Sequence, residues 1–340
     1  MNGVLLINYA HHKSKTTVRP ATLEYSIQGM GMEFVDVWVS RLLVKAYGGM
    51  FSAHIPNLCD QARDLIHSFY IKKAEAIPGK RIKVIINPRG GRGNAQGLWA
   101  SQCEPLFRAA HCKITVESTE YFQHALKIAE ELDISSYDAV VCVSGDGVPH
   151  EIFNGFAKRK DAGEALRKIA VCPLPAGSGN GMCWTMHGTD SGSLTSLIYI
   201  KGVHTPIDLV SVTQGDKRIL SVLSQSYGIV AESDLGTENL RWMGGARFTV
   251  GLLQRIWGKD AYPCDIAYKT VMDDKNTIKE YYRRGGDPPA EGETQHDGLP
   301  PLKYGTVNDE LPDGWALNKY PTIGNFYAGN VSTTNLKLLC

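Results

Sequence analysis

Apolar residues in the middle of the chain come in short runs, and each run ends in a glycine-rich turn. The runs are KVIIN, DAVVCVS and KIAVCPLP, and the turns after them read PRGGRGN, GDG and AGSGNG. Runs of this length bounded by glycine predict buried strands, and residues 95–110 and 121–132 between them have the character of helices. This alternation predicts a parallel α/β sheet whose glycine turns share one edge, where ligands bind in such folds.

Beyond about Thr205 the apolar runs become shorter and alternate with polar residues. PIDLVSV, RILSVLSQSYG and CDIAYKTVM are the clearest of them. A period of two predicts strands with one solvated face, which is typical of antiparallel sheets. The segment 273–303 is rich in charge, glycine and proline, so we expect a long exposed loop there.

The first 79 residues have a different texture. A strand-like piece lies near residues 23–27, and apolar residues recur at helical spacing over residues 34–46, before Gly48 and Gly49. We expect a packing helix, with contact to a membrane as the alternative. The domains expected are a divergent N-terminal region over 1–79, an α/β nucleotide-binding domain over 80–205, and an antiparallel β domain over 206–340.

Composition narrows the classes of function. The 340 residues carry a formal net charge of +1, so no general field attracts nucleic acid. The eight cysteines show no CxxC pair and no zinc-type spacing, which fits free thiols in a reducing cytosol. Because no apolar run approaches the ~20 residues that span a bilayer, we expect a cytoplasmic protein with peripheral membrane contact.

The first glycine turn, NPRGGRGNA, follows a predicted strand and precedes a predicted helix. Glycines let the backbone approach a phosphate, and Arg89 and Arg92 can donate charge-assisted hydrogen bonds to its oxygens. The turn is not the GxxxxGK[ST] P-loop. Taken alone, it is equally well explained as a tight turn with solvated arginines.

The second turn places Asp146 between Gly145 and Gly147, directly after an apolar strand. A carboxylate there can accept a hydroxyl proton during phosphoryl transfer. Next come His150, Glu151 and Asn154, which we expect on a helix. The alternatives are a plain turn for GDG and a partner of the helix dipole for Glu151.

The third turn holds Gly177, Ser178, Gly179 and Asn180, a second nest of phosphate size before another helix. Two glycine loops and an acidic turn at successive strand ends are much less probable by chance than any one of them. Together they predict a nucleotide site.

A fourth segment, AESDLGTENLRWMGGARF, reads as one helix. Asp234, Glu238 and Arg241 are spaced i, i+4 and i+7, so they would share one face. We expect its acids to pair with a cationic amine and Arg241 and Arg247 to contact phosphates. The alternative is a surface ladder of salt bridges.

With these motifs the sequence resembles the sphingosine (sphingoid long-chain base) kinases of the diacylglycerol kinase superfamily, most closely the fungal ones. NPRGGRG, SGDGxxHExxNG and LPAGSGN are motifs of the superfamily, and SDLGTENLRWMGGARF is typical of the long-chain-base branch. The resemblance covers roughly residues 37–330. It implies an α/β nucleotide domain joined to an antiparallel β-sandwich that holds a lipid tail.

The resemblance also implies roles for individual residues. Asp146 would be the general base with Glu151 as its acidic partner, and Asp234, with Glu238 beside it, would bind the lipid head group. The implied reaction transfers the γ-phosphoryl group of MgATP to the C1 hydroxyl of sphingosine, dihydrosphingosine or phytosphingosine. No metal ligand and no oligomeric state are assigned. The residues expected to bind ATP are Asn87, Arg89, Gly90, Gly91, Thr119, Gly145, Gly147, Gly177, Ser178, Gly179, Asn180, Arg241 and Arg247.

A long alkyl chain needs an apolar pocket. Five candidates fall on one side of a predicted helix, and ordinary core packing explains them equally well. They are Phe248, Leu252, Leu253, Ile256 and Trp257.

One departure from the family concerns the C-terminus. These kinases usually carry a late Asp-Gly-Glu motif, which this chain lacks, so we expect the second domain to be incomplete. The competing interpretations are a ceramide or diacylglycerol kinase and an inactive protein that binds lipid or nucleotide. A soluble NAD kinase would share the GDG turn but not the segment from Asp234 to Phe248.

Overall fold

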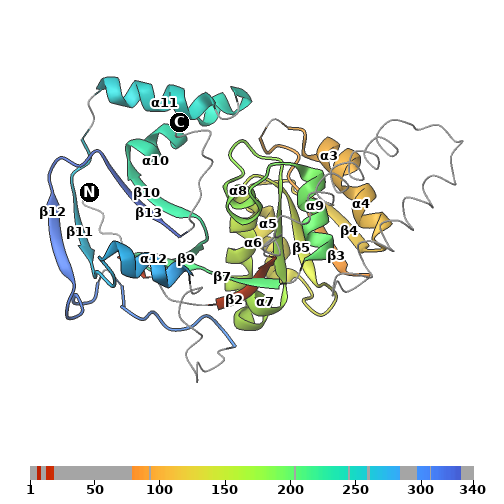
Figure 1. Ribbon diagram of the computed structural model, residues 1–340, viewed down its shortest axis with the longest axis horizontal. Helices are drawn as coiled ribbons and strands as arrows, with labels where there is room; N and C mark the ends of the chain where they lie inside the picture. Colours follow the sequence, from red (N-terminus) through yellow and green to blue (C-terminus); the bar gives the residue numbers. More distant parts are fainter. Residues whose placement is uncertain are drawn as a thin grey trace, which may run out of the picture.

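The computed structural model describes residues 6–8, 13–18 and 79–330, except 92, 203, 244–245, 259–260, 284–296 and 307. The strand predicted near residues 23–27 and the helix predicted over 34–46 lie outside these residues. The described chain forms two lobes side by side, one built on a parallel sheet and one rich in antiparallel strands (Figure 1).

The first lobe contains a four-stranded parallel sheet in the order β4-β3-β5-β6. Its strands are β3 (Arg81–Ile86), β4 (Lys113–Ser118), β5 (Ala139–Ser144) and β6 (Ala170–Pro175). The three strands predicted from apolar runs are confirmed as β3, β5 and β6. Every residue of β5 and β6 is buried, which is why these two strands read as unbroken apolar runs.

Helices cover both faces of this sheet. A hydrophobic core lies on each face of the sheet. On one face Val141 and Val143 pack with Trp99 and Phe107, and on the other face Val140 belongs to a second core with Ile152 and Phe153. The helix predicted over 95–110 is present but has a π-helical turn at its centre. The helices are α3 (Ala95–Leu98), the π segment η3 (Trp99–Cys103), α4 (Glu104–Ala109), α5 (His124–Glu131), α6 (Gly147–Ala157), α7 (Ala162–Lys168), α8 (Gly181–His187) and α9 (Gly192–Lys201).

The second lobe confirms the predicted antiparallel pairing. Pairs form between β8 and β9, β10 and β13, and β11 and β12. The prediction of a loop over 273–303 is wrong in part, because residues 275–283 form a helix whose first turn is capped by Asp274. The elements are β7 (His204–Asp208), β8 (Val210–Gln214), β9 (Lys217–Ser221), β10 (Ser224–Gly228), α10 (Ile229–Leu235), η4 (Glu238–Met243), α11 (Ala246–Gly258), β11 (Cys264–Tyr268), α12 (Lys275–Arg283), β12 (Ala316–Tyr320) and β13 (Asn325–Gly329).

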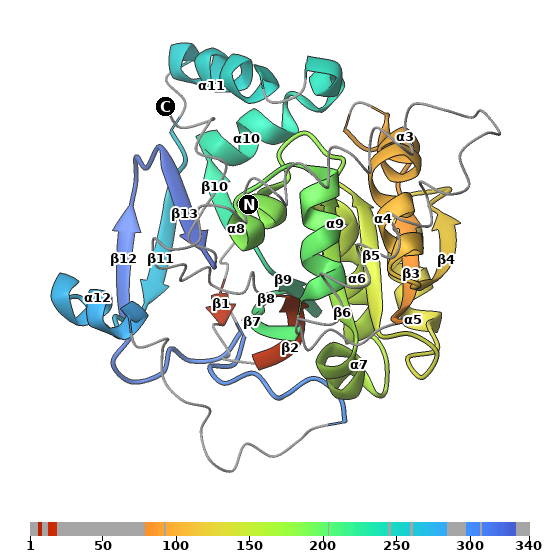
Figure 2. The ribbon, with the colours of Figure 1, turned by 45° about the vertical axis from the view of Figure 1, so that its right-hand side comes forward.

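Two strands from the start of the chain join this second lobe. β1 (Leu6–Asn8) pairs antiparallel with β8, and β2 (Lys13–Val18) pairs antiparallel with β7. Both ribbon views place β2 beside β7 and α7, where the lobes meet (Figures 1 and 2). The N-terminal region therefore supplies one strand each to two sheets whose other strands come some two hundred residues later.

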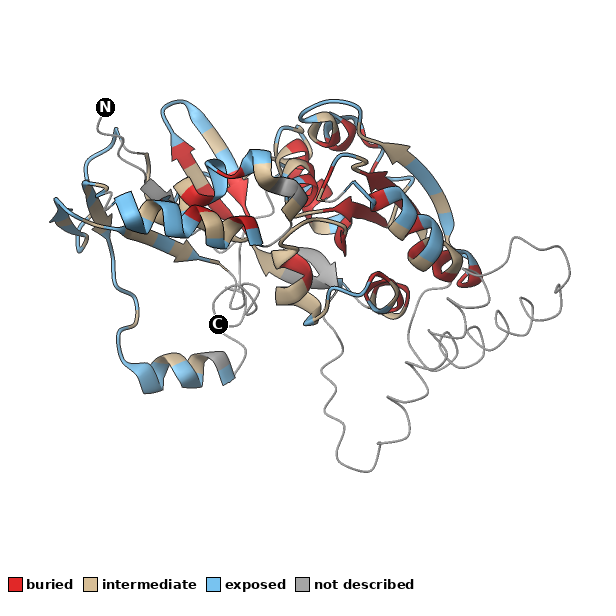
Figure 3. Cartoon of the chain, turned by 90° about the horizontal axis from the view of Figure 1, so that it is seen from above, coloured by how far each residue is buried: buried red, intermediate tan, exposed pale blue. Residues whose placement is uncertain are grey.

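Burial differs between the lobes. Buried residues concentrate in the parallel sheet and the helices on it, while much of the second lobe is intermediate or exposed (Figure 3). Among the described residues no helix is both long and apolar enough to cross a bilayer.

Candidate functional site

The three glycine turns meet in one cavity of about 570 Å³ at the carboxyl ends of β3, β5 and β6. Residues from α10 and α11 of the second lobe complete its wall. The lining residues are Asn87, Arg89, Gly90, Gly91, Thr119, Glu120, Tyr121, Phe122, Gly145, Asp146, Gly147, Val148, Glu151, Gly177, Ser178, Gly179, Asp234, Arg247 and Phe248.

Most of the predicted site residues lie in this lining, and three do not fit it as simply. Asn180 shapes the third turn from within: its amide oxygen accepts the Gly177 N–H at 2.8 Å and its amide nitrogen donates to the Gly177 carbonyl at 3.1 Å. Glu238 and Arg241 belong to η4, and the side chain of Arg241 lies outside the described part of the chain.

Backbone packs directly on backbone where the turns meet. A Cβ atom on Gly177 would lie 2.2 Å from the Cα of Gly145, and one on Gly91 would lie 2.4 Å from the carbonyl oxygen of Ala176. Gly91 also has φ of +55°, which glycine adopts without strain. Larger residues would therefore force the turns apart, and glycine leaves the floor of the cavity to backbone groups.

The carboxylate of Asp146 links two of the turns. One oxygen accepts the Gly181 N–H at 2.8 Å and the other accepts the Met182 N–H at 2.9 Å, so Asp146 caps the start of α8. Burial raises the pKa of Asp146, and these backbone hydrogen bonds partly oppose the rise. Each oxygen has a further lone pair, so the carboxylate can still accept a hydrogen bond from a ligand.

The carboxylate of Glu151 also caps a helix, the start of α5. Its carboxylate accepts the Ala125 N–H at 3.1 Å, at the first turn of α5. Burial raises the pKa of this carboxyl as well, again opposed by backbone hydrogen bonds. Residues 119–122, shortly before α5, line the cavity, so the contact of Glu151 with the start of α5 fixes the end of that segment.

Sequence reasoning missed the aromatic residues of that segment. The ring of Tyr121 stacks on the ring of His124 with 4.3 Å between centroids, while the Phe122 side chain is 85% exposed. Tyr121 and Phe122 both line the cavity. The available signal in the sequence was this pair of adjacent aromatic residues, which follows the predicted ATP contact Thr119 after one residue.

The single helix predicted through AESDLGTENLRWMGGARF is wrong. α10 ends at Leu235, η4 follows, and α11 begins only at Ala246, so the predicted i, i+4, i+7 face does not exist. The chain turns back instead, because α11 packs on α10. This return brings Arg247 to Asp234, thirteen residues earlier.

Arg247 and Asp234 form an ion pair inside the cavity wall. Nη2 of Arg247 donates to Oδ1 of Asp234, and Nη1 donates to the Asp234 carbonyl at 3.0 Å and to Oγ1 of Thr237 at 3.3 Å. The guanidinium also lies 4.1 Å from the ring centre of Phe248. Arg247 is 6% exposed, whereas the Asp234 side chain is 54% exposed.

The other candidates for a lipid pocket behave differently from Phe248. Leu252, Leu253, Ile256 and Trp257 are 37%, 60%, 56% and 90% exposed. Core packing is therefore wrong for these four, and together they form an apolar outer face of α11.

Asn154 joins the lobes behind the cavity. Its amide donates to the Leu220 carbonyl and accepts the Leu220 N–H, both at 2.8 Å, as a neighbouring strand would. This double hydrogen bond ties α6 to β9. It gives the HEIFNG motif a structural purpose beyond the cavity.

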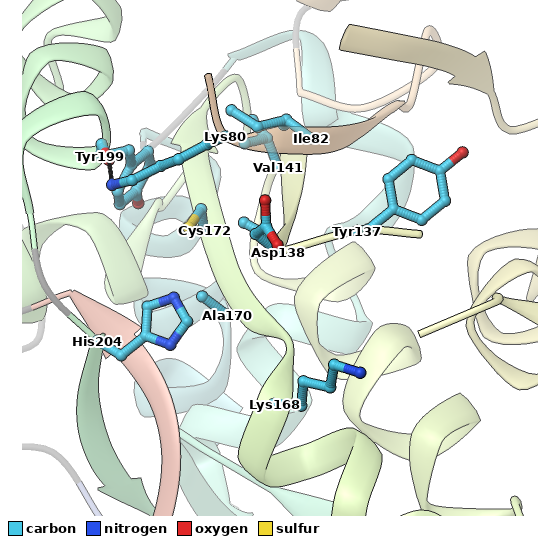
Figure 4. A pocket seen from close by; sticks show the side chains of 11 residues that line it. Lys80, Ile82, Tyr137, Asp138, Val141, Lys168, Ala170, Cys172, Tyr199 and His204 are labelled. Carbon is cyan, nitrogen blue, oxygen red and sulfur yellow. Dashed lines mark hydrogen bonds between the residues drawn. The ribbon is translucent and has the colours of Figure 1, made fainter. Parts of the chain in front are cut away.

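A second cavity, of about 180 Å³, lies at the opposite ends of the strands (Figure 4). There the Lys80 ammonium donates to the carbonyls of Tyr199, Ile200 and Gly202 at 2.9–3.2 Å. Lys80 thus caps α9, and burial lowers its pKa. The fold accounts for this lysine without a ligand.

Comparison with known proteins agrees with the site. The family model "Diacylglycerol kinase catalytic domain" matches residues 81–212, and a domain of unknown function matches residues 1–48. Sphingoid long chain base kinase 5 of Saccharomyces cerevisiae is 41% identical over 235 residues, which are 68% of this chain and 34% of that protein. Sphingoid long chain base kinase 4 of Schizosaccharomyces pombe is 40% identical over 205 residues, 60% of this chain and 44% of that protein.

More distant relatives have similar names. Human sphingosine kinase 1 is 35% identical over 201 residues, 56% of this chain and 52% of that protein. A solved structure titled as a putative diacylglycerol kinase from Bacillus anthracis str. Sterne aligns with 59% of this chain and 63% of that chain, at 17% identity and a TM-score of 0.45. The chain spans about a third to a half of the length of these curated relatives. Residues 81–212 belong to the diacylglycerol kinase catalytic-domain family, and the chain is a relative of the sphingoid long-chain base kinases.

Proposed function

We propose that the chain transfers the γ-phosphoryl group of ATP to the C1 hydroxyl of a sphingoid base. The observation that carries this proposal is the composition of the cavity. It combines three backbone turns of phosphate size, two arginines from different lobes and the half-buried carboxylate of Asp146. The names of the related proteins support the same reaction.

The glycine turns and the arginines would hold the triphosphate. Backbone N–H groups can approach phosphate oxygens where no Cβ intervenes, and Arg89 and Arg247 add positive charge from the first and the second lobe. Phosphoryl transfer depends mainly on positioning and charge stabilisation, which such a cradle supplies.

Asp146 is the residue we expect to receive the hydroxyl proton. It is half-buried, and the loss of solvation raises its pKa towards working pH, which favours general base catalysis. Its hydrogen bonds to the start of α8 hold it still while the hydroxyl approaches.

A magnesium ion fits this cavity if the phosphates bring it. The described residues hold no group of three or more His, Cys, Asp or Glu side chains that could bind a metal by themselves. Magnesium at phosphate sites is usually bound by one or two carboxylates, phosphate oxygens and water. Asp146 and Glu120, which both line the cavity, would be the carboxylates that hold the ion, and the ion would neutralise charge on the phosphates.

Asp234 points to a cationic lipid head. Its carboxylate lines the same cavity and stays half exposed, so an ammonium group could reach it. Ceramide and diacylglycerol have no such ammonium. The choice among sphingosine, dihydrosphingosine and phytosphingosine is not made by this contact.

The apolar face of α11 would meet the membrane that holds the lipid. Leu253, Ile256 and Trp257 are exposed on it, and large apolar side chains in a cluster mark binding or membrane surfaces. We infer a cytosolic enzyme that touches the membrane peripherally through α11.

The test is transfer of labelled γ-phosphate from MgATP to dihydrosphingosine, ceramide and diacylglycerol in parallel. We expect label on dihydrosphingosine alone, and none with Asp146→Asn, which keeps the size of the side chain. Label on ceramide or diacylglycerol instead would contradict the substrate. ATP binding without any product would favour the inactive binding protein.

A further inference from the structure

The Asp234–Arg247 ion pair joins the two substrate positions of the proposed reaction. Asp234 is the expected contact of the lipid ammonium, and Arg247 is an expected contact of the ATP phosphates. Without ligands each satisfies the other, since Nη2 of Arg247 donates to Oδ1 of Asp234. The ion pair therefore partly neutralises each of the two charges before the substrate of that residue binds.

Resting on the proposed function, we propose that this ion pair couples the two substrates, so that the lipid ammonium strengthens ATP binding and ATP strengthens binding of the ammonium. An ammonium that takes over the Asp234 carboxylate releases the charge of Arg247 towards phosphate. A phosphate that engages Arg247 likewise releases Asp234. By linkage the two effects are equal in size.

The guanidinium is already held in place for this exchange. Nη1 donates to the Asp234 carbonyl and to the Thr237 hydroxyl, and neither bond involves the Asp234 carboxylate. Arg247 would thus keep its position when the carboxylate turns to another cation. Only the charge contact changes.

Arg247 also has an unused donor. Its Nε is buried and has no hydrogen-bond partner among the residues that the structure describes. A buried donor without a partner costs free energy, and an anionic ligand would satisfy it. Asp234, by contrast, is half exposed and free to exchange partners.

The size of the coupling is bounded by the exposure of Asp234. Partly exposed ion pairs are screened by water, so replacing one partner changes a binding constant by roughly two- to fivefold. A mainly structural role for the pair predicts a change of opposite sign, because a damaged wall would weaken ATP binding.

The decisive measurement is the affinity for a non-hydrolysable ATP analogue, by calorimetry, without lipid. Asp234→Asn should bind the analogue roughly two- to fivefold more tightly than the unchanged chain. Glu232→Gln is the matched control, because it removes a half-exposed, ion-paired carboxylate from the same helix, α10, at a residue outside the cavity lining. It should leave binding of the analogue unchanged.

A second measurement needs no variant. An alkylamine without a hydroxyl group, present below its micelle concentration, should raise the affinity of the unchanged chain for the analogue towards that of Asp234→Asn. With adenosine, which lacks phosphates, the amine should have no effect.

Several results would overturn the coupling. They are unchanged or weaker analogue binding in Asp234→Asn, equal tightening in Glu232→Gln, or an amine effect that persists with adenosine. If the unchanged chain binds the analogue and the amine independently, only the coupling fails. If it binds no analogue at all, the proposed kinase function fails with it.

Discussion

Glu151 offers the sharpest distinction between a chemical and a positioning role. If its carboxylate only accepts backbone N–H groups at the start of α5, Glu151→Gln should preserve that function, because an amide oxygen can accept them too. Glu151→Ala should not. A role as acidic partner in catalysis predicts that both variants are equally damaged.

The expected size follows from known losses of helix caps. Losing the acceptor at a helix N-terminus costs about 0.5–2 kcal/mol. For a protein of this size, with an unfolding entropy of about 0.7 kcal/mol/K, that loss lowers Tm by roughly 1–3 °C. Since residues 119–122 line the cavity shortly before α5, ATP binding should weaken about three- to tenfold in Glu151→Ala, for about 1 kcal/mol of lost ordering.

The pH dependence gives an independent check. Burial raises the folded-state pKa of Glu151, so the neutral acid is favoured by folding. Its contribution to stability is full below the unfolded pKa of about 4.3 and is lost as pH rises through the folded pKa. Relative to Glu151→Gln, the unchanged chain should therefore lose stability between acidic and neutral pH.

The assays are thermal unfolding at several pH values and calorimetric ATP binding. Glu131→Ala is the control, since it removes a carboxylate from α5, the helix that Glu151 contacts, at a side chain that is 68% exposed. The positioning role would be refuted if Glu151→Gln lost as much ATP affinity as Glu151→Ala.

Three further predictions follow from the fold. Gly177→Ala should abolish ATP binding and destabilise the protein by about 1–3 kcal/mol, because its Cβ would lie 2.2 Å from the Cα of Gly145. The control is Gly298→Ala, which has open space around it and should leave unfolding and ATP binding unchanged. Equal effects of the two substitutions would contradict this packing. Burial lowers the pKa of His187 to about 4. The contribution of the neutral imidazole to stability should therefore be full above about pH 6.5 and fall as the pH drops towards 4. In urea unfolding, the unchanged chain should lose more stability between pH 7 and pH 5 than His187→Gln does. Leu253→Ser with Trp257→Ser should reduce cosedimentation with vesicles and spare ATP binding, whereas unchanged cosedimentation would exclude α11 as the membrane contact.

The sequence was most informative where burial is complete. β3, β5 and β6 are apolar almost throughout, so these strands and the glycine turns after them could be located from the runs of apolar residues in the sequence. β4 was missed because it is an edge strand with exposed residues, including Val116 at 45%. A strand that is half exposed carries no long apolar run.

The contacts between distant residues could not be read from spacing. Asp234 and Arg247 meet because the chain turns back between α10 and α11, which a helical face drawn through Glu238 does not anticipate. The caps made by Asp146 and Glu151 likewise depend on how neighbouring helices approach the sheet. The roles of the cavity residues and the incomplete C-terminus stay predictions.

The pairing of β1 with β8 sets an order for folding during synthesis. Leu6 is made early, but its partner Thr213 leaves the ribosome only after the whole parallel sheet has been made. Contacts this far apart in sequence close late, because a long loop must first be ordered. The lobe built on the parallel sheet can therefore assemble first, while the earliest strands wait unpaired, exposed to chaperones and to misfolding, until the second lobe is made.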